Sequence, residues 1–91
     1  MHVTDGCFCS TAHLEDISPD GLCLSRLADR FARADGPLTV FAGGLEPMPV
    51  VHVRPRWAEH GWDGWRLGGE IADPTTAWRL FFIRSAQHAL R

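Results

Sequence analysis

The stretch PVVHVRPRW, residues 49–57, has the alternating pattern of a β-strand. Val51, Val53 and Trp57 are predicted to share one face, because successive side chains of a strand point to opposite sides. The opposite face is polar and basic, with His52, Arg54 and Arg56. Pro55 has no amide hydrogen to donate to a neighbouring strand, so we expect it near a sheet edge or at a β-bulge.

Strand patterns also flank this stretch on both sides. LTVFA, residues 38–42, is short and apolar and ends at two glycines. WDGWRLGGEIA, residues 62–72, alternates Leu67 and Ile71 with Arg66 and Glu70. The chain after residue 37 is therefore predicted to form antiparallel strands.

TAWRLFFIR, residues 76–84, follows a predicted turn at Asp73-Pro74. Interpreted as a strand, it places Trp78 and Phe82 on one face and Phe81 and Ile83 on the other. A strand that is apolar on both faces is central in its sheet or lies in an interface. Residues 85–91 are predicted to form a short terminal helix.

The main helix is predicted within residues 18–36. Ser18 is suited to an N-cap and Pro19 to the first helical position. Leu24, Leu27 and Phe31 recur at helical spacing, and residues 35–37, Asp-Gly-Pro, favour termination. The resulting fold class is α+β, with one main helix packed on a four- to five-stranded, mostly antiparallel sheet in a single domain, residues 1–91.

The composition is that of a folded globular protein, with 45% hydrophobic and 22% charged residues. The chain contains no lysine, tyrosine or asparagine, which is typical of proteins from GC-rich bacterial genomes. Neither a secretory signal nor a membrane-spanning stretch is recognisable. With only three cysteines, the sequence favours a cytoplasmic protein with reduced thiols.

Charge is unevenly distributed along the chain. The net charge is −2, but residues 1–50 carry −4 and residues 51–91 carry +2. If the predicted strands are in register, basic side chains gather on one sheet face and could bind an anion or an acidic partner. This candidate binding set is His52, Arg54, Arg56, Arg66 and Arg79. Solvated strand polarity is the alternative, and nucleic acid is possible but not favoured at this net charge.

CFCSTAH, residues 7–13, brings two cysteines and a histidine close together in sequence. Cys7 and Cys9 are not spaced as the C-x-x-C knuckle of common zinc sites. We therefore expect reduced, partly buried thiols and no cofactor. The alternative is a zinc site made by Cys7, Cys9, His13 and Cys23.

The sequence lacks the motifs of the common catalytic sites, including a G-x-S-x-G nucleophile, a phosphate-binding loop and H-E-x-x-H. GWDGWRLGGEIADPTTAWRLFFIR, residues 61–84, resembles the paired strands of RelE-like ribosome-dependent mRNA nucleases. The resemblance implies an RNA-cleaving toxin in which Arg66 and Arg79 match the arginines of the family's sheet.

The leading hypothesis is a small non-enzymatic binding or regulatory module that acts through protein–protein contacts. Its partner would be another protein or a second copy, as a homodimer. The predicted interface is Trp78, Phe81 and Ile83. The RelE-like nuclease and a zinc-stabilised regulatory domain remain the alternatives.

Overall fold

The computed structural model describes residues 1–33, 36–42 and 48–89. The strands are β1 (His2–Thr4), β2 (Cys9–Thr11), β3 (His13–Ser18), β4 (Gly21–Leu27), β5 (Leu38–Phe41), β6 (Val51–Gly61) and β7 (Gly64–Ile71). The helices are the single turn α1 (Asp29–Ala32) and the longer α2 (Thr76–Ala89).

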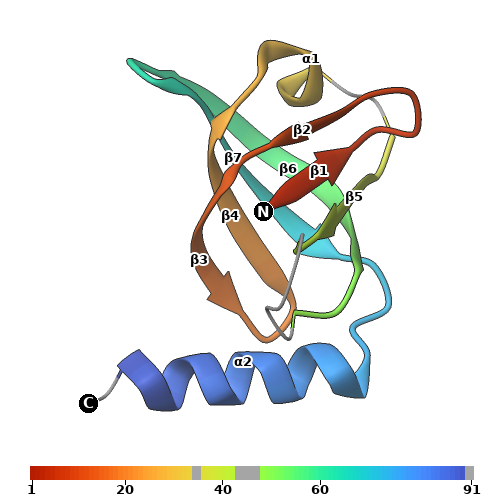
Figure 1. The fold of residues 1–91 in the computed structure, drawn as a ribbon, viewed down its shortest axis with the longest axis vertical. Helices are drawn as coiled ribbons and strands as arrows, with labels where there is room; N and C mark the ends of the chain where they lie inside the picture. The colour runs from red at the N-terminus through yellow and green to blue at the C-terminus, as the bar shows by residue number, and fades with distance from the viewer. Residues whose placement is uncertain (34–35, 43–47, 90–91) are drawn as a thin grey trace.

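The strands form one seven-stranded antiparallel sheet in the order β2-β1-β5-β6-β7-β4-β3. The two edge strands, β2 and β3, are separated in the chain by Ala12 alone. The two edges of the sheet must therefore approach each other, and the sheet curls into a barrel-like shape (Figure 1).

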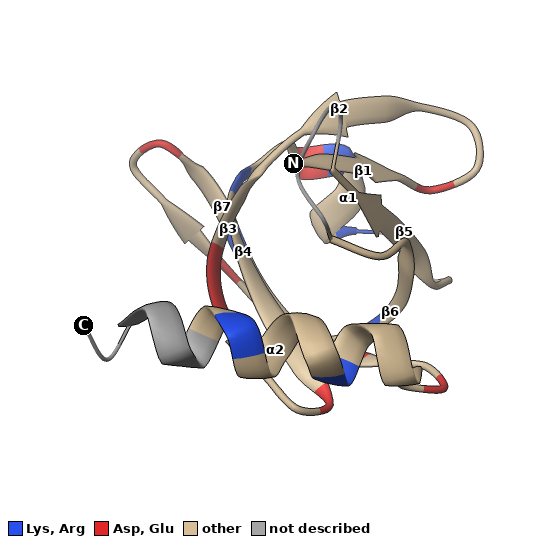
Figure 2. Cartoon of the chain, turned by 60° about the horizontal axis from the view of Figure 1, so that its bottom comes forward, with Lys and Arg blue, Asp and Glu red and all other residues tan. Residues whose placement is uncertain are grey.

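The inner face of this curled sheet carries the hydrophobic core. Each strand from β4 to β7 contributes alternate side chains, and Leu24, Val40, Val53 and Leu67 are all fully buried. Helix α2 lies across one end of the barrel, as Figures 1 and 2 show from two sides. Its Trp78 is also fully buried and joins the same core cluster.

The predicted α+β class with a main helix on a four- to five-stranded sheet is wrong. The protein is mostly β, and the described residues hold only α1 and the C-terminal α2 as helices. Both errors concern segments whose apolar residues satisfy two periodicities.

The predicted main helix within residues 18–36 is wrong, because in the described part, residues 18–33, only the single turn α1 is helical. Ser18 ends β3, Pro19 and Asp20 form the turn, and Gly21 begins β4. Leu22 and Leu24 face the core with strand spacing, whereas Leu27 follows after three positions instead of two. The register shifts between Leu24 and Leu27, so an irregularity in β4 returns Leu27 to the core. Because of this irregularity, Leu24 and Leu27 both face the core although they are three positions apart, which is also the spacing of a helix.

Residues 76–84 are helical and not a strand. Thr75 acts as the cap, because its Oγ1 accepts a hydrogen bond from the Trp78 backbone N–H at 3.1 Å. Trp78 is buried, and Phe81 and Phe82 are half-buried, at the i, i+3 and i+4 spacing of a helix. The second of the two paired strands that the RelE-like resemblance implies is therefore absent, because residues 76–84 belong to helix α2.

Strand β6 contains the bulge expected at Pro55. The register with β7 shifts between Pro55 and Trp57, so Arg56 is the extra residue. Trp57 consequently lies on the outer face, paired with Gly68, and not on the inner face that simple alternation from Val53 predicts. The outward-facing Trp57 lines a groove on the outer face of the sheet.

Candidate functional site

The predicted basic set is divided between the sheet and the C-terminal helix. His52, Arg54 and Arg56 lie exposed on β6, and Arg66 lies half-buried on β7. Arg79 lies exposed on α2, so it does not belong to the sheet face on which the sequence placed it. Arginine positions of α2 are visible in blue on the helix that lies across the end of the barrel (Figure 2).

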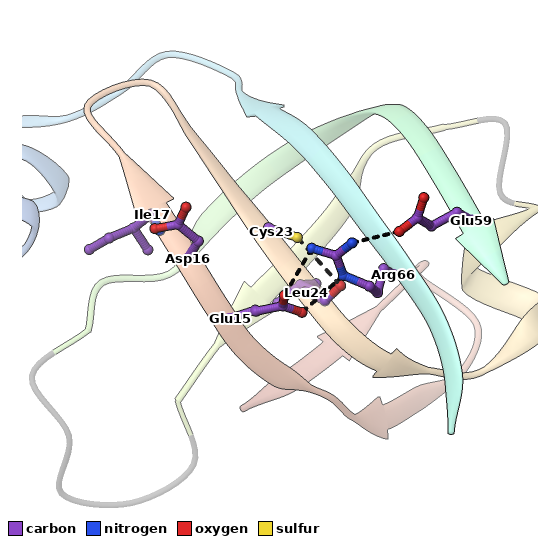
Figure 3. A network of polar contacts seen from close by, with 7 residues as sticks. All are labelled: Glu15, Asp16, Ile17, Cys23, Leu24, Glu59 and Arg66. Carbon is purple, nitrogen blue, oxygen red and sulfur yellow. Dashed lines mark hydrogen bonds and ion pairs between the residues drawn. The ribbon is translucent and has the colours of Figure 1, made fainter. Parts of the chain in front are cut away.

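Two of the sheet arginines are matched by carboxylates. Arg56 binds Glu70, with Nε 3.1 Å from Oε2. Arg66 contacts Glu15 through two nitrogens, at 2.9 and 3.2 Å, and Glu59 through a third. Figure 3 shows the Arg66 guanidinium between Glu15 of β3 and Glu59 of β6. These contacts tie three strands together across the outer surface and leave less positive charge for an anion.

The pKa values at this network have the directions expected of ion pairs. Hydrogen bonds from Arg66 lower the pKa of Glu15, and those to Glu15 and Glu59 raise the pKa of Arg66. Both arginine and glutamate therefore stay charged across the physiological range. His52 takes part in a different contact, with its Nδ1 3.0 Å from the Thr39 hydroxyl.

The predicted interface residues have three different environments. Trp78 is 0% exposed, so it is a core residue in this fold. Phe81 is half-buried and packs against it, with ring centroids 5.5 Å apart. Ile83 is 48% exposed, and Leu80 on the same helix is 47% exposed. Only Ile83 of the predicted set is freely available to a partner.

The alternative zinc ligands are spread over the β1–β2 loop, β2, β3 and β4. Cys7, Cys9 and His13 are exposed, and Cys23 is half-buried. Within the described residues, no three histidine, cysteine or acidic side chains are grouped as a metal site requires. The geometry does not assemble Cys7, Cys9, His13 and Cys23 into one site.

One concave surface among the described residues is an open groove of about 350 Å³ on the outside of the barrel. It is lined by residues 16–18, 20–23, 56–57 and 68–70, which belong to β3, β4, β6, β7 and the β3–β4 turn. We call this surface the Trp57 groove. The groove is formed by two hairpins, β3–β4 and β6–β7, which are separated in the sequence.

The floor and one wall of the Trp57 groove depend on a glycine. A Cβ atom at Gly68 would lie only 2.2 Å from Cε2 and Nε1 of Trp57, so the indole occupies the space that a side chain would take. Trp57 remains 47% exposed. The indole is thus held against β7 by one side while the rest of its surface is available.

One cross-strand row runs through the groove. Asp16 pairs with Cys23, Cys23 with Gly68, and Gly68 with Trp57. Adjacent strands are about 4.8 Å apart, so the Gly68 and Asp16 backbones are separated by roughly 10 Å. Cys23 lies between them. Its pKa is raised, first by burial and then by the Glu15 charge, so it is a weak nucleophile.

The sequence did not reveal this groove, although its signals were present. The bulge expected at Pro55 is confirmed, but simple alternation still placed Trp57 on the wrong face of the strand. The Gly68-Gly69 pair was the second signal. A Cβ at Gly68 would meet Trp57 outside the barrel, and one at Gly69 would come within 2.3 Å of Val53. Two adjacent glycines therefore accommodate neighbours on opposite faces.

Comparison with known proteins adds no assignment. No family model matches the chain, and no curated protein or solved structure shows significant similarity to it. Over the part of the chain that is described, no helix has the length and apolarity needed to cross a membrane.

Proposed function

We propose that this protein is a small non-enzymatic binding module that acts through protein–protein contacts, with the Trp57 groove as its binding surface. The observation that carries the proposal is the half-exposed Trp57, fixed over Gly68 at the wall of an open groove. Tryptophan is enriched among the residues that dominate binding energy at protein interfaces. Its cytoplasmic location, with Cys7, Cys9 and Cys23 as free thiols, is part of the same proposal.

The energy available from Trp57 is sufficient to make it an anchor. Burial of the remaining half of a tryptophan, roughly 100 Å² of mostly apolar surface, contributes about 2–3 kcal/mol. The indole is already held by its contact with Gly68, so little further conformational entropy is lost when a partner docks. A partner segment that covers this side chain would therefore gain a substantial part of its affinity there.

The groove offers little to a catalytic mechanism. Its cysteine has a raised pKa, and its arginine, Arg56, is bound to Glu70. The ribonuclease alternative requires Arg66 and Arg79 to converge on RNA, but they lie on β7 and α2. A binding role is the function that these features support best.

A random peptide library displayed on phage tests the proposal. Peptides selected on the wild-type protein should bind Trp57→Ala at least about tenfold more weakly. Trp62→Ala is the matched control, because Trp62 is 95% exposed and does not line the groove. Failure to select any binder, or peptides that lose affinity only with Trp62→Ala, would contradict the proposal.

Self-association is a second candidate, favoured by the exposed Leu80 and Ile83 on α2. These residues are three positions apart and therefore share one side of the helix. Sedimentation equilibrium tests it. A concentration-dependent dimer that becomes monomeric on replacement of both residues by Glu supports a homodimer, and a wild-type monomer at millimolar concentration rules it out.

A further inference from the structure

We infer that the Trp57 groove receives an arginine side chain of its protein partner. This inference rests on the proposed function and names the chemistry of the partner at the same site. It follows from the charge of the groove, from the residues that are already paired, and from the spacing between the aromatic wall and the carboxylates opposite.

The charge of the groove is negative. Three carboxylates, Asp16, Asp20 and Glu70, and one guanidinium, Arg56, line it, so its formal charge is −2. Arg56 is bound to Glu70. The charge that remains belongs to Asp16 and Asp20 on the opposite side of the groove.

Asp16 and Asp20 contrast with the other acids of this surface. Glu15, Glu59 and Glu70 each bind an arginine. Asp16 and Asp20 form no ion pair with any residue in the described ranges, and both are exposed. Their Oδ1 atoms accept only local hydrogen bonds, from the Ile17 backbone N–H at 2.9 Å and from the Ser18 hydroxyl at 3.3 Å. Each carboxylate thus retains an oxygen for a ligand.

The aromatic wall complements these carboxylates. A guanidinium can stack on an indole and donate forked hydrogen bonds to a carboxylate, whereas an ammonium provides only a compact charge. The guanidinium of Arg66 already lies 5.7 Å from the centre of the Trp57 ring. Arg66 is held by Glu15 and Glu59 beside Cys23, and it is not one of the residues that line the groove.

The width of the groove fits such a side chain. About two strand spacings, roughly 10 Å, separate the Gly68 backbone beneath the indole from the Asp16 backbone. The floor between them is Cys23, a small side chain with a raised pKa that stays neutral at pH 7. A planar guanidinium placed between Trp57 and Asp16 would contact the indole on one side and a carboxylate on the other.

The test compares two small probes of equal shape by heteronuclear NMR. N-acetyl-arginine methylamide carries the guanidinium, and N-acetyl-citrulline methylamide replaces it with a neutral urea. We expect the arginine probe to shift the Trp57 indole N–H and the Gly68 amide, with a dissociation constant about tenfold below that of the citrulline probe. Tenfold corresponds to about 1.4 kcal/mol.

Paired variants of equal charge change provide the control. Asp16→Asn with Asp20→Asn should weaken arginine binding about fivefold or more, whereas Asp63→Asn with Asp73→Asn should change it less than twofold. All four positions are exposed, but Asp63 and Asp73 lie outside the groove. Equal shifts with arginine and citrulline, or equal weakening by both double variants, would overturn the inference.

The two proposals fail in different ways. If selected peptides require Trp57 but bind unchanged when each of their arginines is replaced by citrulline, the groove is a docking site and the arginine inference is wrong. If the peptides do not depend on Trp57, the proposed function itself is wrong. A lysine probe that binds better than arginine would also overturn the choice of guanidinium.

Discussion

Removal of Trp78 should release helix α2 from the end of the barrel. The side chain is fully buried, and its ring packs against Phe81 with centroids 5.5 Å apart. Its indole N–H is shared between the carbonyl oxygens of Ser18 and Pro19, at 3.2 and 3.1 Å. Trp78→Ala removes the apolar contact, leaves a cavity and eliminates the donor, which together should destabilise the fold by about 3–5 kcal/mol.

Urea unfolding followed by far-ultraviolet circular dichroism measures this effect without relying on tryptophan fluorescence. With a slope of about 1–1.5 kcal/mol per molar urea, the midpoint should fall by roughly 2–5 M. Leu80→Ala is the matched control on the same helix, because Leu80 is 47% exposed and should change stability by only about 0.5 kcal/mol. A loss below about 1 kcal/mol with Trp78→Ala, or equal losses in both variants, would refute the role assigned to Trp78.

Three further predictions concern the groove and the first hairpin. Gly68→Ala should displace Trp57, lower the unfolding free energy by about 1–3 kcal/mol and weaken peptide binding. Gly36→Ala is the control, because a Cβ there meets nothing within 4 Å. Urea titrations and binding assays should detect no change in the control variant. Backbone N–H groups of Phe8 and Cys7, together with Arg30, lower the pKa of Asp5 from 3.8 to about 2, so its stabilising effect is present above pH 4 and is lost as pH falls toward 2. Asp5→Asn should remove this component in unfolding measured between pH 2 and 5, and an unchanged pH profile would refute it. Iodoacetamide at pH 8 should modify the exposed Cys7 and Cys9 before Cys23, whose burial raises its pKa, and peptide mass spectrometry that finds Cys23 modified first would contradict that order.

The sequence predicted the central part of the sheet because one periodicity dominates there. Strand alternation from Val51 to Val53, and from Leu67 to Ile71, has no helical counterpart, and the structure buries these residues on the inner face. The bulge near Pro55 was also predictable, since proline cannot donate a ladder hydrogen bond. Local chemistry was decisive in each of these cases.

The two errors in fold arose where local patterns were ambiguous. Residues 18–36 begin with Ser-Pro-Asp, which is suited both to a helix start and to a tight hairpin turn. The long-range pairing of β4 with β7 decides between them, and no short window of sequence contains that information. Conversely, residues 76–84 look like a strand because four apolar residues are consecutive, although Thr75 provides a helix cap.

The candidate site could be predicted only in fragments. The acids that neutralise Arg66 are Glu15 and Glu59, which are 51 and 7 positions away in sequence. Their pairing depends on the order of β3, β4, β7 and β6 in the sheet. Without this order, the arginines alone indicate an anion site, whereas in the Trp57 groove Asp16 and Asp20 form no ion pair with any described residue.

The most direct test of the binding role is the position of a bound peptide. Nuclear Overhauser effects measured between a selected peptide and the labelled protein report which side chains the peptide contacts. We expect effects to the Trp57 indole and the Cys23 β-protons, on opposite sides of Gly68. Effects confined to the exposed Trp62 of the β6–β7 turn, or to Leu80 and Ile83 of α2, would contradict the proposed binding surface.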